Sequence, residues 1–182
     1  VYLADHARLR RPCAIKLIRP DRAAHGEALL SFEREVQATA ALTQPNIVRI
    51  YDYGLTDDAT LYYAMEYLDG LTLEQMVGNL GPLPAPRAVH SLLQICSALR
   101  EAHEAGLIHR DIKPGNVMAC LLGGVKDQVK LLDFGLVEIV SGANGSADAG
   151  RPKSIAGTPA YMSPEQVAGI ANLDARSDIY SL

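Results

Sequence analysis

The sequence has 182 residues, a formal net charge of −4 at pH 7 and 48% hydrophobic residues. This length is enough for one domain with a real core, and the interspersed charges form no basic patch for nucleic acid or an anionic membrane. No apolar run reaches transmembrane length and no stretch reads as a signal peptide. We therefore expect a cytoplasmic segment without membrane contact, while an anchor elsewhere in the protein stays open. Three cysteines lie in apolar runs without C-x-x-C spacing and are expected to be buried free thiols: Cys13, Cys96 and Cys120.

The first predicted element is a β-hairpin. Apolar runs at 1–4 and 14–18 flank a polar turn, and the second run ends before Pro20. Lys16 lies within that second run. Taken alone, a strand lysine is nearly always a solvated edge residue.

An amphipathic helix is predicted next, over residues 23–42. Its apolar side chains recur on one face: Leu29, Phe32, Val36 and Ala40. Glu33 and Glu35 belong to the same helix, where a carboxylate is most often solvated.

A second hairpin is predicted from strands at 48–53 and 61–67, joined by a polar turn. Its second strand runs into Met65-Glu66-Tyr67-Leu68 and then Asp69-Gly70. From its spacing alone, Met65 is a core residue.

Two helices follow the second hairpin. The first, at 72–77, begins with the capping-box spacing of Thr72 and Gln75, and the second covers 86–105. The expected buried stripe of the second helix is Val89, Leu92, Leu93, Cys96, Leu99 and either Ala102 or His103. His90 and His103 have no partners at metal-ligand spacing, so we expect them to be structural or surface residues.

The segment 109–116, His-Arg-Asp-Ile-Lys-Pro-Gly-Asn, concentrates polar side chains between an apolar helix and an apolar strand. Asp111 is the right type to accept a proton, Asn116 to hold a hard cation and Lys113 to neutralise a phosphate. A hairpin of strands 117–122 and 129–132 should bring Asp133 next to Asn116.

Residues 141–150 are rich in Gly, Ala and Ser and have no apolar period, which is typical of a mobile loop. The run Gly-Thr-Pro-Ala-Tyr-Met-Ser-Pro-Glu follows at 157–165. Asp178 then stands near the end of the sequence.

Taken in order, these motifs resemble the Ser/Thr protein kinases, in wording closest to the eukaryotic-like bacterial type. The matches are A-I-K, a helix Glu, the hinge, H-R-D-x-K-x-x-N, D-F-G and G-T-x-x-Y-x-x-P-E. The resemblance implies a two-lobed α+β fold, with part of the N-lobe at 1–66 and the hinge and first part of the C-lobe at 67–182. ATP would bind between the lobes with Mg²⁺, or Mn²⁺ in its place, and the partners would be proteins carrying Ser or Thr.

By this resemblance, four residues would perform the transfer. Asp111 would accept or orient the proton of the substrate hydroxyl, and Lys113 would neutralise the γ-phosphate. Asn116 and Asp133 would hold the metal. Lys113 also favours a Ser/Thr kinase over tyrosine kinases and small-molecule kinases of related fold.

The resemblance also implies a nucleotide site. Lys16 would hold the α- and β-phosphates, and Glu35 would aim it, with Glu33 as the fallback. Further residues implied to contact ATP are Val1, Ala14, Met65 as gatekeeper, Glu66, Leu68 and Met118.

Three residues would regulate the enzyme. Arg110 would clamp a phosphate on the loop, with Ser154 as leading acceptor and Ser141 and Ser146 behind it. Thr158 would contact Asp111 and Lys113. Residues expected to support the site structurally are His109, Phe134, Glu165 and Asp178.

The family domain extends beyond both ends of this sequence. We expect the Gly-rich phosphate loop upstream and further C-lobe helices downstream, one of them carrying an Arg that partners Glu165. Residues 1–182 alone are therefore expected to expose apolar faces, to fold poorly and to be inactive. The alternative function is a pseudokinase, a nucleotide-binding scaffold that a degraded upstream loop would produce.

Overall fold

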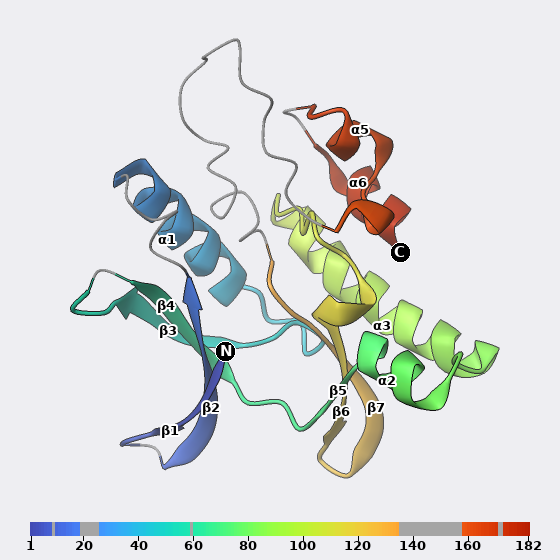
Figure 1. Cartoon of the computed structure of the whole chain (residues 1–182), viewed down its shortest axis with the longest axis horizontal. Helices are drawn as coiled ribbons and strands as arrows, with labels where there is room; N and C mark the ends of the chain where they lie inside the picture. The colour runs from blue at the N-terminus through green and yellow to red at the C-terminus, as the bar shows by residue number, and fades with distance from the viewer. Residues whose placement is uncertain (9, 19–25, 59, 135–157, 171–172) are drawn as a thin grey trace. The chain divides into compact units, whose positions relative to one another are not determined.

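The computed structural model describes residues 1–182 except 9, 19–25, 59, 135–157 and 171–172 (Figure 1). Within the described residues the chain forms two compact units. The first unit comprises Val1–Ala41 and Arg49–Tyr67, and the second comprises Leu42–Val48, Leu68–Gly135 and Gly157–Leu182. The proposed phosphate acceptors Ser141, Ser146 and Ser154 lie outside the described residues.

The first unit is built on an antiparallel sheet in the order β1-β2-β4-β3. Its strands are β1 (Tyr2–His6), β2 (Arg11–Ile18), β3 (Ile50–Leu55) and β4 (Leu61–Glu66). Burial alternates along β4, where Leu61, Tyr63 and Met65 face the core, as the two-residue period of a strand requires.

β3 begins two residues later than the sequence suggested, because Ile47 and Val48 pair elsewhere. Ile47 forms an isolated parallel bridge with Leu131, and the Val48 N–H donates to the Leu131 carbonyl (3.0 Å). Both residues are buried in the second unit. Hydrophobic pattern alone could not show which sheet they would join.

Helix α1 (Gly26–Ala40) lies beside this sheet (Figure 1) and packs against β3. Phe32 and Val36 are fully buried, and the Phe32 ring meets Tyr53 edge-on with centroids 6.1 Å apart. The predicted face was wrong at its last position, since Ala40 is exposed and Thr39 is buried. Thr39 can be buried because its hydroxyl donates to the Glu35 carbonyl (2.8 Å).

The second unit combines a small antiparallel sheet with helices. Its strands, in the order β5-β6-β7, are β5 (Gly70–Thr72), β6 (Val117–Leu122) and β7 (Val125–Leu131). Its helices are α2 (Leu73–Leu80), α3 (Ala85–Glu104), η2 (Pro114–Asn116), η3 (Pro159–Tyr161), α5 (Pro164–Val167) and α6 (Ala175–Ser181). Its core forms where α3 packs on β7 and includes Ile95, Ala98, Leu99, Ala102, Ile112, Val117, Val129, Leu131 and Phe134.

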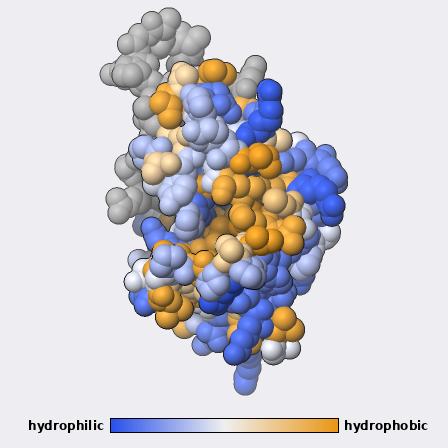
Figure 2. Space-filling view, turned by 90° about the vertical axis from the view of Figure 1, so that its right-hand side faces the viewer, coloured by the Kyte–Doolittle hydropathy of each residue, from blue (hydrophilic) through white to orange (hydrophobic). Residues whose placement is uncertain are grey.

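The predicted buried stripe of α3 was largely wrong. Val89, Leu92, Leu93 and Cys96 are exposed, whereas Ser91, Ile95, Ala98, Leu99 and Ala102 are buried. α3 carries apolar residues on two faces, and the buried face has small Ala98 and Ala102 side chains that allow close approach to the sheet. Figure 2 shows the surface that faces right in Figure 1, and hydrophobic residues, coloured orange, gather in a patch on it. Of the three cysteines, only Cys13 and Cys120 are buried as expected.

α3 is the longest described helix, with 20 residues. Neither it nor any other helix in the described part of the chain combines the length and hydropathy needed to cross a membrane.

Gly70 in β5 permits close pairing with β6. A Cβ at this position would collide with the Ala119 carbonyl oxygen and lie 2.9 Å from Cys120 Cα. Because the obstacle is backbone, Gly70→Ala should lower the free energy of unfolding by about 1–3 kcal/mol, measured by urea denaturation. The matched control is Gly78→Ala in α2, where nothing lies within 4 Å; it should raise stability by about 0.5–1 kcal/mol. Equal stabilities of both variants would contradict this account.

Candidate active site

The loop that joins α3 to β6 is anchored by a buried histidine. His109 is fully buried, and its ring packs on Phe134 with centroids 4.7 Å apart. The Asp111 N–H donates to its Nδ1 (3.2 Å), so the ring proton lies on Nε2, which donates to the Leu132 carbonyl (2.7 Å). A neutral His109 therefore ties the backbone of Asp111 to the residue that follows β7.

Burial lowers the pKa of His109 below its ordinary value of 6.5, and the opposing attraction of the Asp178 carboxylate is smaller. Below about pH 6.5 the unfolded chain therefore binds a proton at this residue that the folded chain does not. As the pH is lowered below about 6.5, the free energy of unfolding should therefore decrease. This residue should contribute up to ~1.4 kcal/mol per pH unit to the decrease.

Urea unfolding at several pH values from 8 down to about 5 would measure this dependence. His109→Gln should remove this contribution to the slope, and replacement of the exposed His90 by Gln should leave it. An unchanged slope in His109→Gln would show that another group is responsible.

A carboxylate from α6 holds the backbone at the start of the loop. Asp178 is 1% exposed, and its Oδ1 accepts from the Arg110 N–H (2.8 Å). Its Oδ2 accepts from the His109 N–H (2.9 Å) and from Nε2 of His103 (2.7 Å) on α3. Three donors converge on one buried side chain, so its position and the loop conformation depend on each other.

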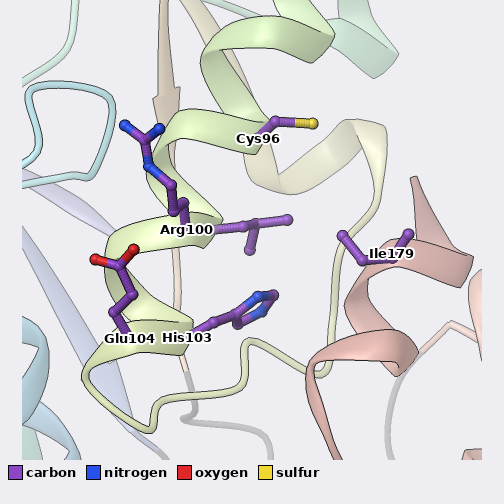
Figure 3. A pocket seen from close by; sticks show the side chains of 6 residues that line it. Cys96, Arg100, His103, Glu104 and Ile179 are labelled. Carbon is purple, nitrogen blue, oxygen red and sulfur yellow. The ribbon is translucent and has the colours of Figure 1, made fainter.

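The His103–Asp178 contact borders an open pocket of about 440 Å³ between α3 and α6. Its lining residues are Cys96, Leu99, Arg100, His103, Glu104 and Ile179. In Figure 3, Cys96 and His103 point toward Ile179 of α6, whereas Arg100 and Glu104 turn away. The sequence offered no partner for His103, because Asp178 lies 75 residues later.

The polar side chains of the loop converge on the Asp111 carboxylate. Its Oδ2 accepts from Lys113 Nζ (2.7 Å) and from Asn116 Nδ2 (2.8 Å). Asn116 Nδ2 also donates to the Asp111 carbonyl (2.8 Å), and Lys113 Nζ donates to Thr158 Oγ1 (3.0 Å). Two donors orient one oxygen of Asp111, and the ammonium group of Lys113 lies beside it.

Asn116 and Asp133 are next to each other in space. The Leu132 N–H donates to the Asn116 carbonyl (2.9 Å), and Asp133 follows at once with φ of 59°, in the left-handed region that few non-glycine residues adopt. Because Nδ2 of Asn116 is committed to Asp111, its Oδ1 is the atom suited to a cation. An amide oxygen and a carboxylate are ligands that Mg²⁺ prefers, so these two residues fit that ion.

No cluster of three or more His, Cys, Asp or Glu side chains suited to a metal occurs among the described residues. Mg²⁺ is commonly held by one or two carboxylates together with substrate phosphates. Asn116 and Asp133 would supply one amide oxygen and one carboxylate to such a site.

The first unit holds most of the predicted nucleotide contacts. Ala14 on β2 pairs with Met65 on β4, and Lys16 pairs with Tyr63, so the two predicted positions Ala14 and Met65 lie side by side. Glu33 and Glu35 are both half-buried on α1. Their exposure therefore does not show which of them would be the partner of Lys16.

Four further predicted positions lie near the ends of strands. Val1 is 75% exposed. The Glu66 N–H donates to the Arg49 carbonyl (2.9 Å) and the Glu66 carboxylate accepts from the Arg49 N–H (2.8 Å), which fixes the end of β4. In the second unit, Leu68 is buried and Met118 lies on β6 opposite Thr72.

The segment that begins at Thr158, directly after the undescribed residues 135–157, is anchored to α6. Glu165 Oε1 accepts from Ser177 Oγ (2.6 Å), and this hydrogen bond is the main reason why the pKa of Glu165 lies below its ordinary value. The Tyr161 carbonyl accepts from Ser181 Oγ (2.7 Å). The predicted site includes Glu165 but neither of these serines.

The comparisons with known proteins agree over the whole chain. The protein kinase domain model matches residues 1–182. The chain is 40% identical to serine/threonine-protein kinase PknB of Mycobacterium leprae over 185 residues, and 40% identical to PrkC of Bacillus subtilis over 182. Each match covers 100% of this chain, but only 28% of PknB and 26% of PrkC.

Among solved structures, the PknI kinase domain of Mycobacterium tuberculosis matches with a TM-score of 0.73 and 31% identity. The match covers 99% of this chain and 64% of that one. The chain thus spans about a quarter of the length of these curated relatives, and about two thirds of the solved domain.

Proposed function

This chain belongs to the protein kinase domain family, and from that premise we propose that it transfers the γ-phosphoryl group of ATP to serine and threonine hydroxyls of proteins. The family uses ATP and a divalent metal. The observation that carries the proposal is the hydrogen-bonded cluster of Asp111, Lys113, Asn116 and Thr158.

Asp111 can accept the proton of the substrate hydroxyl. Lys113 and Asn116 both bond to Oδ2, so Oδ1 is the oxygen that an incoming hydroxyl would approach. The hydroxyl oxygen forms a bond to the γ-phosphorus, the bond to the ADP oxygen breaks, and the proton passes to Asp111.

Lys113 supplies positive charge where the transferred group would lie. Its ammonium group is 2.7 Å from the Asp111 carboxylate and 3.0 Å from Thr158 Oγ1, so it is held in place before any substrate binds. Preorganised charge of this kind stabilises negative charge that develops in the transition state. Thr158 would thereby connect the run at 157–165 to the reacting groups.

Asn116 and Asp133 would hold Mg²⁺, or Mn²⁺ in its place, and the ion would neutralise charge on the phosphate oxygens. Lys16 would hold the remaining phosphates with Glu35 as its aiming partner, and Glu33 stays the fallback. The remaining ATP contacts would be made by Val1, Ala14, Met65, Glu66, Leu68 and Met118.

We propose that activity is controlled by phosphate on the loop that contains Ser154. Arg110 precedes Asp111 directly, and its guanidinium can bind a phosphate through two parallel hydrogen bonds. A phosphate bound there would act on the residue next to the proton acceptor.

The full-length protein with Mg·ATP labelled at the γ-phosphate, alone and with a generic acceptor protein, tests the proposed function. Label should appear on serine or threonine, and mass spectrometry should find loop phosphate at or near Ser154. Label on tyrosine alone would refute the assigned class. Bound ATP without any transfer would instead indicate a nucleotide-binding scaffold.

A further inference from the structure

The side chain of Gln166 on α5 connects two separate backbone segments. Its Oε1 accepts from the Ser163 N–H (3.0 Å), and its Nε2 donates to the Arg110 carbonyl (2.8 Å). One amide therefore links the start of α5 to the loop that carries Asp111, 56 residues earlier in the chain.

The residue that Gln166 contacts has an unusual backbone conformation. Arg110 has φ of 67°, in the left-handed region, where the Cβ of a non-glycine residue is crowded by its own backbone. Such a conformation persists only where the surroundings hold it. Here the Arg110 N–H is bound by Asp178 (2.8 Å) and its carbonyl by Gln166 (2.8 Å), so both of its peptide groups are held.

The peptide bound by Gln166 is the one that joins Arg110 to Asp111. Its plane sets the direction in which the Asp111 side chain leaves the backbone, because the peptide group is rigid and planar. Rotation of this peptide would move the carboxylate relative to Lys113 and Asn116, whose bonds to Oδ2 are 2.7 and 2.8 Å.

Gln166 can act as a fixed support because α5 is itself anchored. Its neighbour Glu165 accepts from Ser177 (2.6 Å), and Ser181 donates to the Tyr161 carbonyl (2.7 Å). Both serines are on α6, which also carries Asp178. The two groups that hold Arg110 thus come from α6 and from a segment attached to α6.

We propose that Gln166 is a positioning residue for Asp111: it holds the Arg110–Asp111 peptide in the orientation from which the carboxylate accepts the substrate proton. The inference rests on the proposed function, in which Asp111 is the proton acceptor. Through this single side chain, the segment from Thr158 to Val167 is connected to the loop that carries Asp111.

The test compares Gln166→Glu and Gln166→Met with a matched control, Gln94→Glu, in the full-length protein. Gln94 also bridges backbone groups of the same unit, accepting from the Val129 N–H (2.9 Å) and donating to the Asp127 carbonyl (2.9 Å). In Gln166→Glu, the ionised carboxylate keeps an acceptor for the Ser163 N–H but repels the Arg110 carbonyl oxygen. Gln166→Met removes both hydrogen bonds without adding charge.

Both Gln166 variants lose the neutral hydrogen bond to the Arg110 carbonyl, which should lower kcat by about 3- to 10-fold. KM for ATP should be unchanged. For Gln166→Glu, kcat relative to the parent should recover as the pH falls from 8 toward 6. The protonated carboxyl can again donate to the Arg110 carbonyl, and its partly buried position favours protonation. Gln166→Met should show no recovery, and Gln94→Glu should leave kcat within two-fold.

Hydrogen exchange of the peptide 109–116 gives a second readout that needs no activity. Exchange should be faster in both Gln166 variants and unchanged in Gln94→Glu. Unchanged exchange and kcat in the Gln166 variants, or an equal loss in Gln94→Glu, would overturn the inference. If the parent transfers no phosphate but exchange responds as expected, the contact stands and the proposed function fails.

Discussion

Asp111→Asn is expected to lower kcat for phosphate transfer by about 100- to 10,000-fold, the range typical of losing a general base. Asparagine keeps the size of the side chain and an oxygen that can accept from Lys113, whose Nζ lies 2.7 Å from the carboxylate. It cannot take up a proton at neutral pH. The affinity for ATP, measured by equilibrium binding, should stay within a few-fold of the parent value.

The matched control for this change is Asp127→Asn on β7. Asp127 also has a cationic partner, Arg87, at 2.6 Å, and the pair is about one-third exposed. A partly exposed ion pair contributes little to stability, so this variant should keep kcat within two-fold. Full activity of Asp111→Asn would show that Asp111 is not the proton acceptor, whatever the parent's substrate.

Asp178→Ala should have the largest effect on stability, about 3–5 kcal/mol in the free energy of unfolding. The buried carboxylate accepts hydrogen bonds from three donors: the His109 N–H, the Arg110 N–H and His103 Nε2. Alanine would leave these donors buried and unsatisfied. Urea denaturation at pH 7 measures this loss of stability. We also expect kcat to fall, because Asp178 holds the backbone N–H of Arg110, the residue directly before Asp111.

Asp174→Ala is the control on the same helix. Asp174 caps the N-terminus of α6 by accepting from the Arg176 N–H (2.9 Å), but its side chain is about half exposed. Its loss should therefore destabilise the protein much less than the loss of Asp178. If the two alanine variants were equally stable, the three hydrogen bonds that Asp178 accepts would not contribute the stability expected of them.

Local features of the sequence predicted local structure well. Thr72 and Gln75 form the expected capping box at α2, with reciprocal hydrogen bonds of 3.1 and 3.0 Å. The strand alternation around Met65 and the hairpin after Asn116 are also present. Caps, turns and alternation depend on residues a few positions apart, so a single sequence contains the information they require.

The order of the polar motifs was equally informative about the family. The segment 109–116 and Asp133 led to the resemblance that the family match over the whole chain confirms. The sequence by itself thus determined the family, the α+β class and the identity of the loop that carries Asp111.

Tertiary structure decided which face of α3 is buried and what holds the loop. α3 offers two apolar faces, and only contact with β7 selects the one containing Ile95 and Ala98. The groups that hold the loop backbone come from 68 and 56 residues later in the chain. The resemblance had named Asp178 as a structural support but not its bonding partners, and no pattern in the sequence indicated Gln166. Hydrogen bonds over such separations form only after the chain has folded, because no periodicity or short motif encodes which distant donor and acceptor will meet.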